Sequence, residues 1–122
     1  MIYIRSEAKK HGMGNQIEGF FETGQKAIII EDLLSTGGSS IKAVEAFKEA
    51  GGVVGGVVAI FTYGFKSCTD AFSQAQIPFT TITDYDTLLR IALKTGYINE
   101  ADHELLMSWN QDPQAWSDAH AN

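Results

Sequence analysis

One stretch decides the fold of this chain: Ile28-Ile29-Ile30-Glu31-Asp32-Leu33-Leu34-Ser35-Thr36-Gly37-Gly38-Ser39-Ser40. An apolar run, two carboxylates and a loop of small residues are typical of a buried strand that turns into a helix. The helix is expected over residues 39–50, where Ala43, Val44, Phe47 and Ala50 recur at helical spacing. Free backbone N–H groups at a helix N-terminus attract an anion, and glycines let the main chain approach it closely. The stretch therefore predicts a phosphate site between a strand and a helix.

Two further features of the stretch favour a bound ligand. The residue three after Ser39 is Lys42 rather than Glu or Gln, so no capping box occupies the N–H donors of the helix. Glu31 and Asp32 are costly at the end of a buried strand without hydrogen-bonding or cationic partners. A ribose diol and a magnesium-bound substrate would supply such partners. The alternative is that Asp32 caps the next turn and Glu31 is merely exposed.

The stretch resembles the phosphoribosyl-pyrophosphate (PRPP) binding motif of type I phosphoribosyltransferases: a hydrophobic strand, two acids, then a Ser/Thr/Gly loop. It is neither a Walker A loop, which needs a Lys before Ser or Thr, nor a G-x-G-x-x-G turn. The resemblance implies a catalytic role for Asp32 and an orotate contact for Ser35. It also implies that the residues touching PRPP are Glu31, Asp32, Leu33, Leu34, Ser35, Thr36, Gly37, Gly38 and Ser39.

A second segment, residues 3–19, resembles the mobile catalytic loop of orotate phosphoribosyltransferase through its basic residues and a following Gly-x-x-x-x-Glu-Gly. The resemblance implies that Arg5, Lys9 and His11 contact PRPP, chiefly its pyrophosphate, and that Lys9 and His11 are catalytic. Cations delivered by a closing loop stabilise the negative charge that develops on the leaving group. Many relatives carry a second basic residue after the arginine, where this chain has Ser6. The alternative reading of the segment is an ordinary solvated basic loop.

Composition limits the classes of function. The chain has 122 residues, 44% of them hydrophobic, which suits one modest domain with its own core. A formal charge of −6 argues against a nonspecific nucleic-acid surface. Cys68 is the only cysteine, so a disulfide within the chain is excluded and a packing role in a reducing compartment is expected. The sequence has no apolar run of about 18 residues that would span a membrane and no signal-type core, and we expect a cytoplasmic location.

Strands and helices alternate along the chain. Strands are expected at residues 2–5, 16–21, 26–32, 53–61 and 79–83, with those at 26–32 and 53–61 covered on both faces. Helices are expected at residues 39–50 and 68–75 and after Asp84, Asn99 and Asp112-Pro113. Tyr63, Phe65, Trp109 and Trp116 are interpreted as packing residues. The alternation favours an α/β fold with a mainly parallel sheet flanked by helices. With the resemblance, it predicts one type I phosphoribosyltransferase-like domain over residues 1–122, with a catalytic loop at about 5–15 and the PRPP motif at 28–40.

The resemblance covers essentially the whole chain but only the C-terminal part of the family's pattern, so the domain is expected to be truncated at its N-terminus. By the resemblance, we expect it to lack the family's N-terminal hood and first α/β unit. The family's activity is transfer of the phosphoribosyl group from PRPP to orotate, giving orotidine 5′-monophosphate and pyrophosphate. The resemblance further implies Mg²⁺ as cofactor, held mainly by PRPP and not by a protein metal site, and a homodimer with shared active sites. Transfer to another base, a noncatalytic PRPP-binding module and a folded fragment that binds little remain as alternatives.

Overall fold

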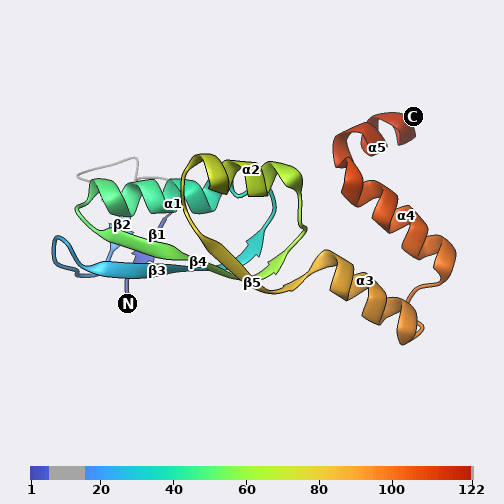
Figure 1. Cartoon of the computed structure of the whole chain (residues 1–122), viewed down its shortest axis with the longest axis horizontal. Helices are drawn as coiled ribbons and strands as arrows, with labels where there is room; N and C mark the ends of the chain where they lie inside the picture. Colours follow the sequence, from blue (N-terminus) through green and yellow to red (C-terminus); the bar gives the residue numbers. More distant parts are fainter. Residues whose placement is uncertain (6–15, 122) are drawn as a thin grey trace.

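The structure, a computed structural model, describes residues 1–5 and 16–121 of the chain. Its centre is a three-stranded parallel sheet in the order β3–β4–β5, formed by β3 (Lys26–Leu34), β4 (Val53–Thr62) and β5 (Phe79–Asp84). The helices α1 (Gly38–Glu49) and α2 (Lys66–Gln74) connect these strands and lie together on one face of the sheet (Figure 1). The prediction of a parallel α/β sheet is confirmed.

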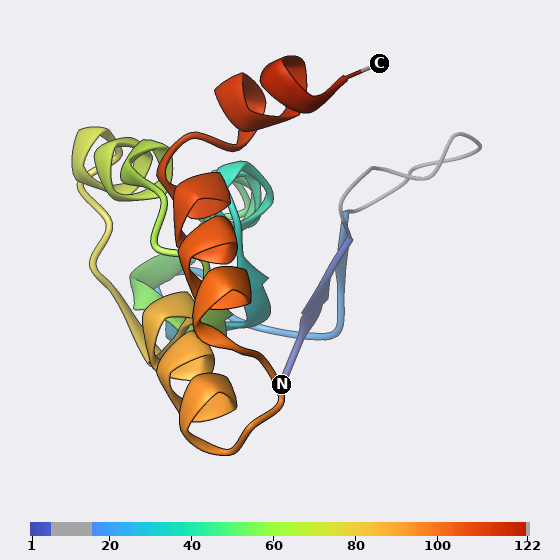
Figure 2. The same cartoon turned by 90° about the vertical axis from the view of Figure 1, so that its right-hand side faces the viewer.

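Two smaller units flank this sheet. A short antiparallel hairpin pairs β1 (Tyr3–Ile4) with β2 (Ile17–Glu18). After β5 the chain continues as α3 (Tyr85–Lys94), α4 (Glu100–Gln111) and α5 (Pro113–His120). These helices extend away from the sheet, with α3 and α4 side by side (Figures 1 and 2). In the described part of the chain, every helix is too short or too polar to cross a membrane.

The predicted starts of the C-terminal helices are confirmed by their caps. The Asp84 side chain accepts a hydrogen bond from the Thr87 N–H at 2.8 Å, which caps α3. The Thr87 N–H holds the pKa of the Asp84 carboxyl below its usual range. Asn99 and Asp102 form a reciprocal capping box at α4, and Pro113 occupies the first turn of α5. Local sequence signals therefore set the boundaries of these helices.

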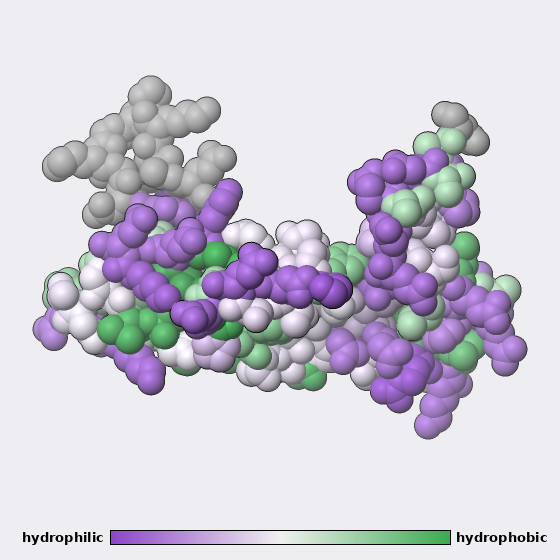
Figure 3. All heavy atoms as spheres, turned by 45° about the horizontal axis from the view of Figure 1, so that its top comes forward, coloured by the Kyte–Doolittle hydropathy of each residue, from purple (hydrophilic) through white to green (hydrophobic). Residues whose placement is uncertain are grey.

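The core lies between the sheet and the two helices that cover it. Val44 and Phe47 of α1 and Phe72 of α2 are at most 1% exposed, and the Phe72 ring packs on Phe79 of β5. Cys68 is also buried there, as predicted, and burial raises the pKa of its thiol. Viewed from the helix side, the outer surface carries many hydrophilic side chains (Figure 3). The helices thus bury one face each and leave a polar surface outside.

The prediction that β3 and β4 are covered on both faces is wrong for the chain as described. Ile30 of β3 is 71% exposed, Ile60 of β4 is 53% exposed and Ile82 of β5 is 75% exposed, whereas Ile29 is only 8% exposed. Successive side chains of a strand point to opposite faces. Because α1 and α2 both cross the same face, the other face of the sheet remains open among the described residues (Figure 1).

Element boundaries also differ from the sequence prediction, as the end of β3 and the start of α2 show. The strand β3 continues to Leu34, two residues further than predicted, because Leu33 and Leu34 still pair with β4, so the two acids lie inside the strand instead of at its end. The helix α2 begins at Lys66, two residues earlier than predicted, and its first residues make exposed contacts such as the ion pair with Asp70.

The uneven covering of the sheet gives a direct test with neighbouring residues. We expect Ile29→Ala to lower the free energy of unfolding by about 2–5 kcal/mol, because it removes buried contacts. Ile30→Ala should change the free energy of unfolding by less than about 0.5 kcal/mol, because its side chain is mostly exposed. Urea unfolding followed by circular dichroism measures both. Both variants are measured at two protein concentrations. If Ile30→Ala lowers the free energy of unfolding as much as Ile29→Ala does, the second face is covered in solution.

Candidate functional site

Three connections of the sheet meet at one edge. Leu34 of β3 pairs with Thr62 of β4, and Thr62 pairs with Asp84 of β5, so the three strands end level with one another. The loop into α1, the turn at residues 63–65 and the start of α3 all follow these ends (Figure 1). Ligands of parallel α/β sheets bind at this carboxyl edge. The predicted phosphate loop therefore lies where the fold favours a site.

The loop between β3 and α1 depends on Gly37. This residue is the N-cap of α1 and has φ 83° and ψ −2°, the left-handed conformation. A Cβ atom at Gly37 would lie 2.7 Å from the Phe72 ring and 3.1 Å from Cys68 Sγ. Both the backbone angle and the close approach of α2 therefore require glycine.

The start of α1 offers donors for an anion. No side chain caps the helix and no acidic residue lies in its first turn. The first backbone N–H groups of an α-helix have no acceptor within the helix, and the helix dipole adds partial positive charge there. The loop residues Ser35, Thr36, Gly38 and Ser39 are exposed. A phosphate can therefore approach these amides from solvent.

Sequence reasoning did not assign Ser40 to the site. Its side chain is 0% exposed, and its Oγ has no hydrogen-bond partner among the described residues. It sits in the first turn of α1, directly after the predicted contact Ser39. The only signal in the sequence is a second serine after Gly37-Gly38, which polarity alone would place on the surface. Its burial is a tertiary effect of the packing of α1 on the sheet.

The two acids of the motif point to different sides of β3. Glu31 is half-buried and Asp32 is exposed, and they are adjacent in the strand. Adjacent strand residues point to opposite faces, so the two carboxylates do not converge above the sheet. However, β3 is an edge strand of the described sheet. A ligand beside this edge can reach side chains from both faces.

Arg5 follows β1 in the β1–β2 hairpin, and its polar contacts are with this hairpin and not with the phosphate loop. Its guanidinium forms an ion pair with the Glu18 carboxylate, and its backbone N–H donates to the Gln16 carbonyl at 2.8 Å. Its Nε is buried without a hydrogen-bond partner in the described residues. Lys9 and His11, the other predicted cations, lie outside the described residues. The structure therefore brings together the motif at 31–40 but does not join Arg5 to it.

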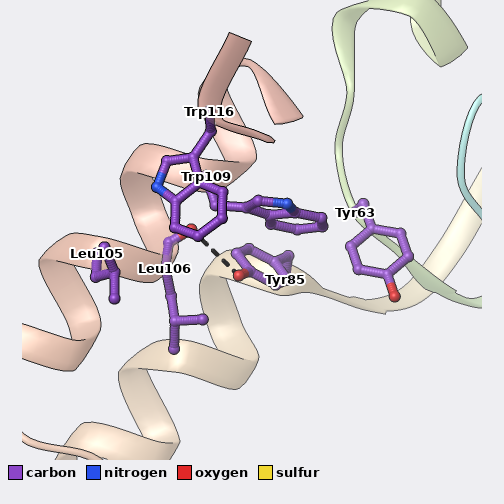
Figure 4. A pocket seen from close by; sticks show the side chains of 6 residues that line it. All are labelled: Tyr63, Tyr85, Leu105, Leu106, Trp109 and Trp116. Atoms are coloured by element: carbon purple, nitrogen blue, oxygen red, sulfur yellow. Dashed lines mark hydrogen bonds between the residues drawn. The ribbon is translucent and has the colours of Figure 1, made fainter. Parts of the chain in front are cut away.

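An aromatic cluster lies beside the same edge of the sheet. As predicted, Tyr63 packs, with its ring stacked on Phe65 at 5.3 Å and edge-on to Trp109 at 5.7 Å. The Tyr85 hydroxyl donates to the Leu106 carbonyl at 3.2 Å, and burial raises the pKa of that phenol. A cavity of about 370 Å³ (Figure 4) is lined by Tyr63, Tyr85, Leu105, Leu106, Trp109 and Trp116. None of these side chains is charged, so the cavity does not suit an anion.

The geometry of the loop predicts opposite effects at two adjacent glycines. We expect Gly37→Ala to lower the free energy of unfolding by more than about 1 kcal/mol, because alanine is strained in the left-handed conformation and its Cβ would meet Phe72. Gly38→Ala should leave the free energy unchanged or raise it by up to about 1 kcal/mol, because the nearest atom to its Cβ is 3.9 Å away. Thermal and urea unfolding measure both variants. A tolerated Gly37→Ala would contradict the described loop.

Comparisons with known proteins agree with the fold and the motif. No family model matches the chain. The chain is 49% identical over 116 residues to the orotate phosphoribosyltransferase of Listeria monocytogenes, a match that covers 95% of this chain and 56% of that protein. Among solved structures, the UMP synthase of Leishmania donovani matches 89% of this chain and 23% of its own, with a TM-score of 0.75 and 25% identity. The orotate phosphoribosyltransferase of Mycobacterium tuberculosis in complex with PRPP matches 65% of this chain and 46% of its own, with a TM-score of 0.55 and 26% identity.

These matches concern part of each relative, because the chain spans about half the length of the curated relatives it matches. Over that part, the parallel sheet with its flanking helices is the type I phosphoribosyltransferase fold. Over this part, the chain is therefore similar to the orotate phosphoribosyltransferases in both sequence and fold.

Proposed function

We propose that this protein binds PRPP and takes part in the transfer of its phosphoribosyl group to orotate, which gives orotidine 5′-monophosphate and pyrophosphate. One observation carries the proposal: an uncapped helix start at Gly37, with no acidic residue in its first turn, follows the strand β3, which carries Glu31 and Asp32, at the carboxyl edge of a parallel sheet. Relatives at about 49% identity are named for this reaction, and one similar structure is a complex with PRPP. This reaction belongs to pyrimidine biosynthesis, and we infer a cytoplasmic location.

In this proposal the motif holds the sugar phosphate. The backbone amides from Thr36 to Ser39 bind the 5′-phosphate, for which the dipole of α1 is favourable. Glu31 and Asp32 accept hydrogen bonds from the ribose hydroxyls, with the sugar lying beside the edge of β3. Their negative charge, and that of Asp32 in particular, stabilises the positive charge that develops on the ribose as the bond to pyrophosphate breaks. Ser35 contacts orotate, and Leu33 and Leu34 shape the backbone around the sugar.

The departing pyrophosphate needs positive charge. We assign this role to Arg5, Lys9 and His11, which neutralise the leaving group as its charge increases. Arg5 is already paired with Glu18 in the hairpin, so it must exchange that partner for a phosphate oxygen. In a homodimer the hairpin of one subunit would approach the site of its partner, which would bring these cations to the motif. A dimer is thus part of the proposal.

The side chains of this chain fit a Mg²⁺ ion that is held jointly by protein and substrate better than a metal site made of protein ligands alone. Among the described residues, no group of three His, Cys, Asp or Glu side chains could hold a metal ion. Glu31 and Asp32 offer carboxylate oxygens, which Mg²⁺ accepts alongside substrate phosphates and water. We therefore infer that PRPP itself provides most of the ligands. When bound, Mg²⁺ neutralises part of the pyrophosphate charge.

Two alternatives use the same phosphate loop. A phosphoribosyltransferase for another base would keep the motif at 31–40, since every assigned contact of that motif except Ser35 is to PRPP alone. A noncatalytic PRPP-binding module would also keep it. Retention of Arg5, Lys9 and His11 favours a transferase over the binding module. The base contact rests on Ser35 alone, so the choice of base needs a direct test.

Calorimetric titration of the chain with PRPP and Mg²⁺ tests the proposal. Asp32→Asn should weaken PRPP binding about tenfold or more, because it removes a charged acceptor of ribose hydroxyls. Asp118→Asn, the same change at an exposed position of α5, should bind PRPP like the unchanged protein. Equally weak heats for the unchanged protein and Asp32→Asn would refute the assigned site.

The same titration, continued with a base, separates the alternatives. Binding or turnover of orotate in the presence of PRPP supports the proposed reaction. A response to adenine but not to orotate supports a transferase for another base. Binding of PRPP, with neither binding nor turnover of either base, supports a noncatalytic module.

The ion pair of Arg5 predicts that one surface change improves binding. Glu18→Gln removes the internal partner of Arg5, so PRPP affinity should rise about twofold to fivefold, the value of an exposed ion pair. In an Arg5→Gln background the same change should have no effect, which makes a double-mutant cycle. Isothermal calorimetry measures all four proteins. An unchanged affinity in Glu18→Gln would show that Arg5 does not reach the pyrophosphate.

A further inference from the structure

One side chain ties α4 to the carboxyl edge of the sheet. The Asn110 Nδ2 group donates to the Tyr63 carbonyl at 2.8 Å. The backbone N–H of Tyr63 in turn donates to the Leu34 carbonyl at 3.2 Å. Leu34 is the last residue of β3, and Ser35 begins the phosphate loop. Two consecutive hydrogen bonds therefore connect α4 to the start of the loop through a single residue.

Tyr63 can couple the position of α4 to the end of β3 because several contacts fix Tyr63 in place. Its ring stacks on Phe65 with an interplanar angle of 6° and meets Trp109 edge-on. The next N–H, that of Gly64, donates to Thr62 Oγ1 at 3.0 Å. Thr62 itself is 8% exposed and in register with Leu34. The turn after β4 therefore has little freedom to absorb a shift of α4.

The bond from Asn110 is not a local helix contact. It joins residues 47 positions apart, the largest sequence separation of any side-chain hydrogen bond in the described part of the chain. The other polar side chains of α3 to α5 mostly bond within their own helix or cap, as Gln114 does with Asp118. The helix α4 does not need this bond in order to form, because it has its own capping box. The bond from Asn110 therefore attaches α4 to the turn that follows β4 in the sheet.

We propose that Asn110 is a positioning residue for the phosphate loop. It holds the Tyr63 carbonyl, and Tyr63 holds the end of β3, so that residues 35–40 keep the shape that receives the phosphate. This inference rests on the proposed PRPP binding. It assigns the C-terminal helices a role in the site although none of their residues is among the proposed PRPP contacts.

The test compares three changes at Asn110 with a matched neighbour. Asn110→Asp keeps the shape but loses the donor, and Asn110→Ala loses the donor without adding charge. Asn110→Gln keeps an amide donor. Gln111→Glu makes the same amide-to-carboxylate change at the next residue of α4, where the side chain is exposed. The readouts are the PRPP dissociation constant with Mg²⁺ by calorimetry, hydrogen exchange of residues 33–41 by mass spectrometry, and the midpoint of thermal unfolding.

We expect Asn110→Asp and Asn110→Ala to bind PRPP about 3- to 10-fold more weakly, the range that one hydrogen bond supports. Residues 33–41 should exchange faster in both. Asn110→Gln should recover much of the affinity, and Gln111→Glu should match the unchanged protein. If Asn110→Asp does not fold, the alanine variant decides.

Two outcomes overturn the inference. If the unchanged protein binds PRPP and the Asp and Ala variants bind equally well, Asn110 only attaches α4, even where thermal unfolding occurs at lower temperature. If the unchanged protein does not bind PRPP, the proposed function fails by itself. In that case unchanged exchange of residues 33–41 in the variants still refutes the positioning role, because the hydrogen-bonded path does not depend on a ligand.

Discussion

The close contact between Gly37 and the α2 residues Phe72 and Cys68 is the constraint on which the rest of this structure depends. A left-handed residue at this point lets β3 end and α1 begin within a few residues, with the helix start facing the sheet edge. The absence of a Cβ lets α2 approach, which closes the core above the sheet. A single backbone conformation thus serves both the packing and the proposed anion binding. Any side chain here would disturb both at once.

The sheet uses its two faces in different ways. The face under α1 and α2 supplies the core, and Val57 and Ala59 of β4 are almost fully buried there. The other face carries exposed isoleucines in neighbouring strands, which is unusual for a parallel sheet. The site itself lies at neither face but at the carboxyl edge and beside β3. The geometry of the loop therefore depends on the covered face and on the turn after β4.

Much of this fold follows from local sequence signals. The strands from Lys26 and Val53 and the caps at Asp84 and Asn99 lie where the apolar pattern and the capping residues predict them. The turn from β3 into α1 also follows from the sequence, since a loop of small residues separates an apolar run from a helical pattern. The exposure of Ile30 could not be predicted, because a continuous apolar run is typical of a strand covered on both faces, whereas the described residues cover only one face.

Long-range contacts explain what local patterns miss. The burial of Ser40 and the bond from Asn110 to Tyr63 depend on how separate elements dock, and no spacing in the sequence records them. The same limit applies to the acids. A motif places Glu31 beside Asp32, but only the extension of β3 to Leu34 shows that the two carboxylates point to opposite faces.

The charges of the site are divided between two parts of the structure, and this division has a consequence for function. The phosphate loop is fixed by the core and needs no charged side chain to attract an anion. Arg5, in contrast, lies in a separate hairpin and is neutralised by Glu18. In the proposed function, binding of a sugar phosphate therefore depends on a preformed backbone, whereas stabilisation of a leaving group requires a change of partner. Because the two requirements are met by different elements, a chain with this fold can retain the first when the second is lost.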